Sequence, residues 1–176
     1  MFELQESVAI DGSSYPIRTD FRVILEIFVM LNDTDLDDGD KTEALMQMFY
    51  MERPKDTEKA IQAFVNFIEP RKPFGSKGAG LVNWEADFDL IAAAVNHVLG
   101  TECRALTYLH WHSFLGAYME ISPDSLFTRV LSIRDKLKSG KRMEKWEWRW
   151  YLKNRELVDL PVKFSDSEQA LLEEWT

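Results

Sequence analysis

The chain of 176 residues is 45% hydrophobic and 12% aromatic, which is enough to build one globular domain with a sizeable core. Its 30 acidic and 21 basic residues give a net charge of -9, which argues against non-specific binding to nucleic acid or to an anionic membrane. The single cysteine, Cys103, excludes an intramolecular disulfide and removes any need for an oxidising compartment.

Two further features point to the cytoplasm rather than to a membrane or to export. The longest apolar stretch, FRVILEIFVML, is interrupted by Arg22 and Glu26, so it falls well short of the roughly 18 uninterrupted apolar residues of a membrane span. The first residues include Glu3 and Glu6 instead of the basic start of a signal peptide. We therefore expect a cytoplasmic protein without a membrane partner.

Charge is unevenly distributed along the chain. Residues 1–100 hold 18 acidic and 9 basic residues, whereas residues 129–155 hold 10 basic and 3 acidic residues. A two-signed molecule of this kind can pack head to tail with copies of itself, which makes a homo-oligomer one expected assembly. Solvated helix faces of opposite sign are the simpler explanation of the same distribution.

The first 18 residues predict a β-hairpin, because two alternating runs flank the favoured turn Asp11-Gly12. After Thr19, apolar residues recur every three or four positions, which predicts an amphipathic helix through Phe21, Ile24, Leu25, Phe28 and Leu31. A second helix is predicted to run to about Tyr50, with Asp40 and Glu43 forming its capping box.

A third helix is predicted between its cap Asp56 and Pro70, with a buried stripe of Ile61, Phe64, Val65 and Ile68. The stretch RKPFGSKGAG reads as a flexible basic loop. Asn83 is the predicted cap of the next helix, which runs through Phe88, Ile91, Ala92 and Val95 and has Gly100 just past its end.

Ser122-Pro123 is predicted to open a later helix, since proline at the first helical position loses no hydrogen bond, and its stripe is Leu126, Phe127, Val130 and Ile133. SDSEQALLEEW predicts a short terminal helix. The prediction is a mainly α protein, a single domain over residues 1–176 with about seven helices. It has a small N-terminal β-hairpin (1–18), a helical core (19–155) and a C-terminal extension (156–176).

The stretch LTYLHWHSFLGAYMEIS places His110 and His112 on either side of Trp111. The two imidazoles could bind zinc together on a strand, where residues two apart share a face, but on a helix they diverge by about 200°. The helical spacing of Trp111, Phe114, Leu115 and Tyr118 favours a helix and separates the pair. We expect no metal, cofactor or catalytic residue; the alternative is a metal-dependent enzyme that uses His97, His110 and His112 with Glu85 or Asp89.

Residues 141–153 combine aromatic and basic side chains. Wound as a helix, they form one stripe of Met143, Trp146 and Trp150, which can enter the core, and a second of Trp148, Tyr151 and Leu152. An exposed second stripe would be a partner-binding surface, with Lys145 and Arg149 beside it to steer acidic partners.

Three alternatives for residues 141–153 stay open. The alternation of Trp146, Trp148, Trp150 and Leu152 also fits a strand. Both faces of a helix would be buried if the last helix covered them. Stacking of bases on the tryptophans would make a single-stranded nucleic-acid binder, which the net acidity of the chain disfavours.

The order of the segments TDFRVILEI, ALMQMFY, AIQAFVNFI, DFDLIAAAV, LHWHSFLGAYMEI and VLSIRDKL over residues 8–155 resembles the phage gene-product-fifteen family of long-tailed siphophages and their prophages. Its most specific residues are Leu109, His110, Trp111, Phe114 and Arg134, which we assign to the fold. His112 departs from the family, which usually has a second aromatic residue at that position.

The resemblance implies a tail assembly chaperone without catalytic activity. Such a protein binds the tape-measure protein, keeps it soluble and helps recruit the major tail protein. It acts in the host bacterial cytoplasm and is absent from the mature virion.

Overall fold

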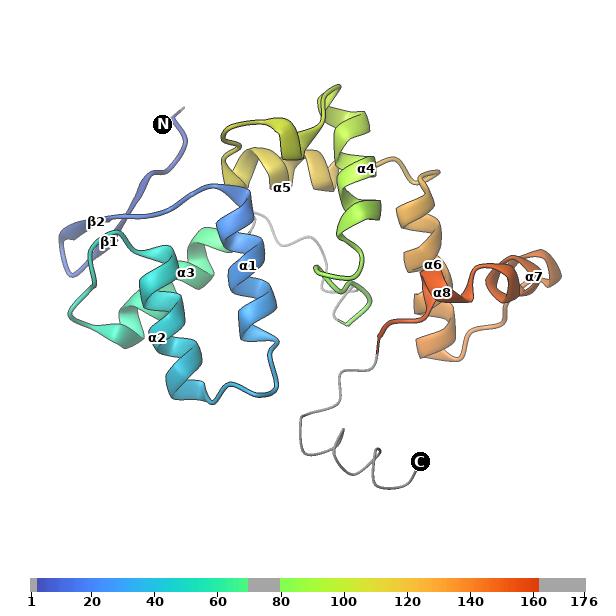
Figure 1. Cartoon of the computed structure of the whole chain (residues 1–176), viewed down its shortest axis with the longest axis horizontal. Coiled ribbons are helices and arrows are strands. Elements are labelled where there is room, and N and C mark those ends of the chain that lie inside the picture. The colour runs from blue at the N-terminus through green and yellow to red at the C-terminus, as the bar shows by residue number, and fades with distance from the viewer. Residues whose placement is uncertain (1–2, 70–79, 162–176) are drawn as a thin grey trace. The chain divides into compact units, whose positions relative to one another are not determined.

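The computed structural model describes residues 3–69 and 80–161 (Figure 1), and the chain divides into two compact units. Of the described residues, unit 1 comprises 3–69 and 108–112, and unit 2 comprises 80–107 and 113–161. The described residues form eight α-helices, one short 3-10 helix and one β-hairpin, which confirms the mainly α prediction. The single domain over residues 1–176 stays a prediction. The predicted basic loop, apart from its last residue, and the predicted terminal helix lie outside the described residues.

The N-terminal hairpin is confirmed. Strand β1 (Ser7–Ile10) pairs with β2 (Ser13–Pro16) in antiparallel fashion, and Ile10 lies opposite Ser13. Asp11 and Gly12 both have positive φ, 50° and 80°, as a two-residue turn that matches the twist of the strands requires. The alternation of the strand buries Val8 and Ile10 against the helices of unit 1.

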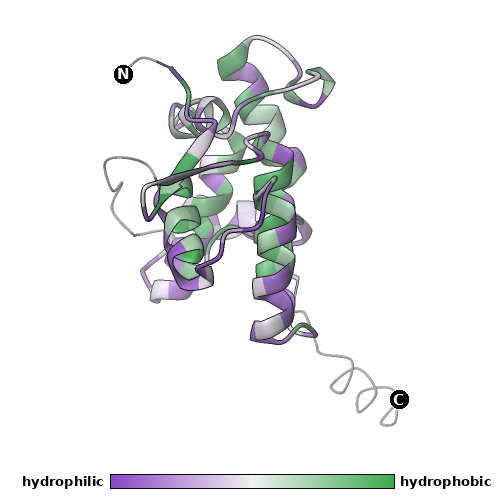
Figure 2. Ribbon diagram, turned by 90° about the vertical axis from the view of Figure 1, so that its left-hand side faces the viewer, coloured by the Kyte–Doolittle hydropathy of each residue, from purple (hydrophilic) through white to green (hydrophobic). Residues whose placement is uncertain are grey.

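Three helices form the body of unit 1: α1 (Phe21–Leu31), α2 (Asp38–Phe49) and α3 (Thr57–Ile68). Helix α1 packs on α2, α2 on α3, and α3 on β1. Asp20 and the predicted cap Asp56 each accept a backbone N–H at the start of their helices. Hydrophobic and hydrophilic residues alternate along the helical ribbons (Figure 2). The buried hydrophobic residues of these three helices include Phe21, Ile24, Ile27, Met46, Phe49, Phe64 and Phe67.

Two details of unit 1 correct the sequence prediction. Helix α2 is capped by Asp37, whose carboxylate accepts the N–H of Asp40 at 2.8 Å, so the capping box of Asp40 and Glu43 is wrong. Glu43 instead binds Arg53 at 2.6 Å. The acidic run before α2 offers several residues that can cap, and periodicity alone does not choose among them. In α3 the buried side is Ala60, Phe64 and Phe67, so the predicted stripe is rotated by about one residue.

Unit 2 contains α4 (Phe88–Leu99), η1 (Cys103–Ala105), α6 (Leu126–Ser139), α7 (Lys145–Lys153) and α8 (Arg155–Val158). Helix α4 packs on α6 and η1, and α6 on α8. Helix α5 (Trp111–Met119) begins in unit 1 and continues into unit 2. Gly100 ends α4 with a left-handed φ of 69°, as predicted. Across the described parts of both units, no helix has the length and apolarity needed to cross a bilayer.

The starts of two helices in unit 2 differ from prediction. Helix α6 is capped by Ser125, and Ser122-Pro123 form a preceding turn in which the Ser125 N–H donates to the Ser122 carbonyl at 3.0 Å. Leu126 is therefore 46% exposed rather than buried. Asn83 accepts two backbone N–H groups in a turn, but α4 itself begins later, after Asp87, whose carboxylate is engaged elsewhere.

A buried ion pair between Arg134 and Asp87 holds α4, α6 and α8 together. Two N–H groups of the Arg134 guanidinium donate to the Asp87 carboxylate at 2.7 and 2.9 Å. The remaining three donate to the carbonyl oxygens of Leu81, Leu157 and Val158 at 2.9, 3.1 and 2.6 Å. All five donors of the guanidinium are thus used, which satisfies a charge that would otherwise be costly to bury.

We expect Arg134→Met to destabilise the protein by about 3 to 5 kcal/mol, because Asp87 would remain as an uncompensated buried charge. The double variant Arg134→Met, Asp87→Leu is expected to recover much of that loss, since no buried charge remains. Urea unfolding of both variants measures the two free energies. A loss below about 1 kcal/mol for Arg134→Met would show that water reaches Asp87 and contradict the burial argument.

Candidate protein-binding surface

The segment before α5 is tied to the start of α1 by backbone hydrogen bonds. The Phe21 N–H donates to the Leu109 carbonyl at 2.9 Å, and the Trp111 N–H donates to the Thr19 carbonyl at 2.7 Å. The Leu109 N–H donates to the Asp20 carboxylate at 3.2 Å. Two segments 90 residues apart in the sequence therefore meet inside unit 1 as a short antiparallel bridge.

His110 lies at the turn into α5 and acts as its cap. Its Nδ1 accepts the backbone N–H of His112 at 3.0 Å, and its Nε2 lies 3.0 Å from the Gln5 carbonyl oxygen. An amide can only donate and a carbonyl can only accept, so the ring is the neutral tautomer with hydrogen on Nε2. Both ring nitrogens are thereby occupied by backbone groups, which favours a structural role over a metal ligand.

The two histidine rings are neighbours, with centroids 5.1 Å apart. The prediction that a helix separates them is wrong, because His110 precedes the first helical residue. His112 Nε2 lies 2.8 Å from the carbonyl oxygen of Phe67, while His97 lies in unit 2 on α4. Within residues 3–69 and 80–161, no group of three or more His, Cys, Asp or Glu side chains is arranged to hold a metal ion.

Trp111 and Phe114 are both buried. The indole Nε1 of Trp111 donates to the Ile68 carbonyl at 3.4 Å, and its ring meets Phe28 edge-on with centroids 5.5 Å apart. Such contacts are those of a core residue. Trp111 and Phe114 thus contribute packing, His110 caps α5, and Leu109 contributes backbone hydrogen bonds to the start of α1.

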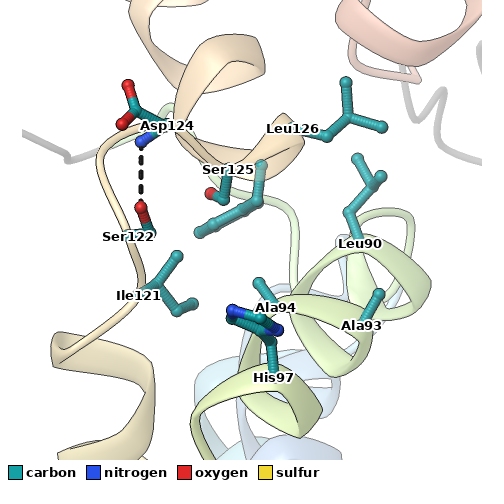
Figure 3. Close-up of a pocket in the computed structure, with 10 residues that line it drawn as sticks. Leu90, Ala93, Ala94, His97, Ile121, Ser122, Asp124, Ser125 and Leu126 are labelled. Atoms are coloured by element: carbon teal, nitrogen blue, oxygen red, sulfur yellow. Dashed lines mark hydrogen bonds between the residues drawn. The ribbon is translucent and has the colours of Figure 1, made fainter.

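A pocket of about 330 Å³ lies in unit 2 between α4 and the start of α6 (Figure 3). Leu90, Ala93, Ala94 and His97 line one side, and Ile121 and Leu126 line the other. Its hydroxyl groups serve local turns: Ser122 Oγ accepts the Asp124 N–H at 3.2 Å, and Ser125 Oγ accepts the Thr128 N–H at 3.1 Å. The pocket is therefore mainly an apolar hollow.

Helix α7 exposes two of its tryptophans and buries a carboxylate. Residues 145–153 form a helix and not a strand, and its buried residue is Glu147. Trp146 is 59% exposed, Trp148 48% and Leu152 59%. The prediction that the stripe of Met143, Trp146 and Trp150 enters the core is therefore wrong. Hydrophobic periodicity places tryptophans and not a glutamate on the buried side of a helix, so it could not predict the burial of Glu147.

Two contacts with α6 explain this orientation. Glu147 forms an ion pair with Lys136, and it also accepts the backbone N–H of Glu144 at 2.8 Å. The Arg129 guanidinium lies over the Trp150 ring, 5.8 Å from its centroid. The hydrogen bond from Lys136, followed by that from Glu144, holds the pKa of the Glu147 carboxyl below its ordinary value. The ion pair and the cation–π contact together fix which side of α7 faces α6.

Two parallel rows lie on the outward side of α7, which also exposes Trp146. Lys145, Arg149 and Lys153 are exposed and follow one another at intervals of four residues, so they lie on one helix face. Trp148 and Leu152, also four residues apart, form the adjacent apolar row. The ring of Trp148 stacks on Tyr151 with centroids 5.3 Å apart, and the Tyr151 hydroxyl donates to the Asp159 carboxylate at 3.0 Å. We call this surface, residues 145, 148, 149, 152 and 153, the α7 face.

A groove of about 300 Å³ adjoins the α7 face. Trp148 forms part of its wall, and the other lining residues come from the end of α6 and the connection to α7: Lys136, Leu137, Gly140, Lys141 and Met143. The groove thus combines apolar side chains with two lysines. Of the five residues predicted to bind a partner, Lys145, Trp148, Arg149 and Leu152 are exposed, and Tyr151 is half-buried beneath Trp148.

In a comparison with protein families, the model described as Bacteriophage Gp15 protein matches residues 2–160. The match confirms the family resemblance that the sequence segments indicated, and it includes every residue of the α7 face. The comparison with curated proteins and the comparison with solved structures each gave no match.

We expect Trp111→Ala to cost about 3 to 5 kcal/mol of unfolding free energy, because a large buried side chain is removed from the core. The matched control is Trp146→Ala, which removes the same side chain from an exposed position and is expected to change the unfolding free energy by less than about 0.5 kcal/mol. Urea unfolding measures both. Equal losses in the two variants would contradict the assignment of Trp111 to the core.

We expect Glu147→Gln to loosen α7, because the ion pair with Lys136 is lost while the side-chain shape is kept. Since folding lowers the pKa of this carboxyl from 4.5, its contribution is present above that value and is lost as the pH falls through the lower folded value. After correction for the intrinsic exchange rate at each pH, hydrogen exchange of residues 145–153 should therefore accelerate on acidification in the parent and already be fast at neutral pH in the variant. Glu156→Gln, at an exposed position on α8, is the control and should change neither rate.

Proposed function

This chain belongs to the Bacteriophage Gp15 protein family, and we propose that it is a tail assembly chaperone that binds the tape-measure protein and helps recruit tail-tube subunits. The proposal describes a protein that works by binding and not by catalysis. Its partners would be the tape-measure protein and the major tail protein. It would act in the host bacterial cytoplasm and leave before the virion is complete.

The exposed apolar row of the α7 face is the observation that supports this proposal best. Two large apolar side chains, Trp148 and Leu152, stand about half exposed on a helix whose polar anchor, Glu147, faces inward. Exposed apolar surface beside polar residues marks binding sites in soluble proteins. A tape-measure protein is long and helical, and a helix binds a partner by placing apolar residues of one face in a groove.

The basic row suits the encounter between such proteins. Lys145, Arg149 and Lys153 add positive charge beside the apolar anchors, although the whole chain carries a net charge of -9. Charges at the rim of an interface raise the association rate more than the affinity. The α7 face would therefore attract acidic segments while the rest of the acidic chain repels them.

A single-stranded nucleic-acid binder is the second candidate, because tryptophans beside basic residues can stack bases and pair with phosphates. The stacking of Trp148 on Tyr151 speaks against it, since one face of the exposed ring is already covered. Leu152 and the groove residues Leu137 and Met143 also suit a protein partner better than a base.

We expect co-expression with the tape-measure protein of the same phage to give a soluble complex with several copies of this chain, as measured by size-exclusion chromatography with light scattering. The double variant Trp148→Asp, Leu152→Asp should reduce complex recovery at least tenfold, because both apolar anchors are lost.

Met51→Asp is the matched control: Met51 is 60% exposed but lies in unit 1, and its replacement should leave the complex intact. A tape-measure protein that stays insoluble with the parent chain would contradict the chaperone proposal. Retention of single-stranded DNA that falls steeply with salt and is lost in the double variant would favour the nucleic-acid candidate instead.

A further inference from the structure

The α7 face carries its charge and its apolar surface in a regular pattern. Apart from Trp146, which is also exposed, the exposed residues after Lys145 follow at intervals of three, one, three and one: Trp148, Arg149, Leu152 and Lys153. On a helix this spacing makes two straight adjacent rows, one basic and one apolar, each with about 6 Å between neighbours. The pattern extends over the whole length of α7, about 13 Å for nine residues.

A surface built from two straight rows is complementary to another helix. A partner helix that lies alongside α7 presents its own residues at the same interval of four, so carboxylates in one of its rows can face all three cations together. Apolar residues in its neighbouring row then meet Trp148 and Leu152. A strand presents only one row of side chains on each face, so it cannot place an acidic row and an apolar row side by side and would match fewer of the five residues.

The groove beside Trp148 gives such a helix a place for one large side chain. Its lining of Leu137, Met143 and Trp148 is apolar, whereas Lys136 and Lys141 add positive charge to it. Part of that charge is already neutralised inside the chain, because Lys136 binds Glu147 and Lys141 binds Asp135. An apolar residue therefore suits the groove better than an acidic one, and the acidic residues of the partner belong opposite the basic row.

We propose that the α7 face recognises an amphipathic helix whose carboxylates, spaced four residues apart, run beside a row of large apolar residues. The partner is thus defined by its chemistry: an acidic helix with an apolar stripe, in either chain direction. This deepens the proposed function by naming the kind of tape-measure segment that would bind, and it rests on that function only for the identity of the partner.

The stacked pair of Trp148 and Tyr151 prepares the surface for binding. Tyr151 is fixed by its hydrogen bond to Asp159, and the Arg155 guanidinium lies 5.8 Å from the centroid of its ring. Trp148 rests on this support with an angle of 21° between the two rings. Less side-chain entropy is lost when an anchor is already held in place, which favours binding of a partner by the free protein.

The test uses two designed helical peptides of about fifteen residues and the full-length chain, with no tape-measure protein present. One peptide carries glutamates at intervals of four beside a row of leucines, and the other carries lysines at the same positions. We expect the acidic peptide to bind at least tenfold more tightly than the basic one, measured by fluorescence anisotropy at low salt. Trp148→Asp combined with Leu152→Asp should abolish both affinities.

Charge reversal on α7 separates specific from general attraction. Lys145→Glu combined with Arg149→Glu should weaken the acidic peptide at least tenfold and strengthen the basic one, whereas the control Lys55→Glu, at an exposed position in unit 1, should change neither. Equal effects of the control would show that overall charge decides binding and would overturn the proposal.

Two other occupants of the α7 face are distinguished by the same proteins. If light scattering shows dimers that the α7 charge reversal dissociates, the occupant is a second copy; if an oligothymidylate displaces the acidic peptide at equal concentration, it is nucleic acid. Either result overturns the proposal. Peptide binding without a tape-measure complex would support the inference about the α7 face and refute the proposed function. A tape-measure complex that the α7 variants do not affect would support the proposed function and refute the inference.

Discussion

The fold of unit 2 depends on the guanidinium of Arg134. Its five N–H groups reach Asp87 at the start of α4 and the backbone carbonyls of residues 81, 157 and 158, so one side chain of α6 connects both neighbours of that helix. A buried charge is tolerated only where its partners are placed accurately, which restricts how α4 and α8 can pack. Helix α7 lies between α6 and α8 in the chain, so its two ends are set by this arrangement.

Within that frame α7 is oriented by polar contacts. An amphipathic helix usually turns its apolar residues inward, because burial of a large side chain contributes about 1.5 to 3 kcal/mol. Here Glu147 occupies the inner side, where Lys136 meets it, and Trp146, Trp148 and Leu152 remain outside. The free energy that burial of these side chains would contribute is therefore missing from the free protein. A partner that covered them would supply it. That cost is the physical argument for a binding surface.

The sequence predicted most of the fold because its local signals agree with the tertiary structure. Asp11-Gly12 can adopt the two positive φ values of its turn. Asp56 begins α3 by accepting a backbone N–H, and Gly100 ends α4 in the left-handed conformation. It failed where several residues offered the same signal, as in the acidic run before α2. It also failed on α7, because hydrophobic periodicity cannot show that Lys136, eleven residues before Glu147, would pair with it. The exposed row of Trp148 and Leu152 was one of the alternatives that the sequence left open, since the second stripe of the helix would be exposed unless the last helix covered it.

The basic row beside those two residues solves a problem that an exposed apolar row creates. Two copies of the chain could bury Trp148 and Leu152 against each other, but that arrangement brings Lys145, Arg149 and Lys153 of both copies together. Like charges that face each other across an interface cost free energy, so the basic row disfavours this pairing of identical faces. The same three cations favour an acidic helix. If the α7 face binds as proposed, attraction for one class of partner and repulsion of a second copy would arise from one set of residues, and this selectivity would suit a protein that must stay dispersed until its partner is made.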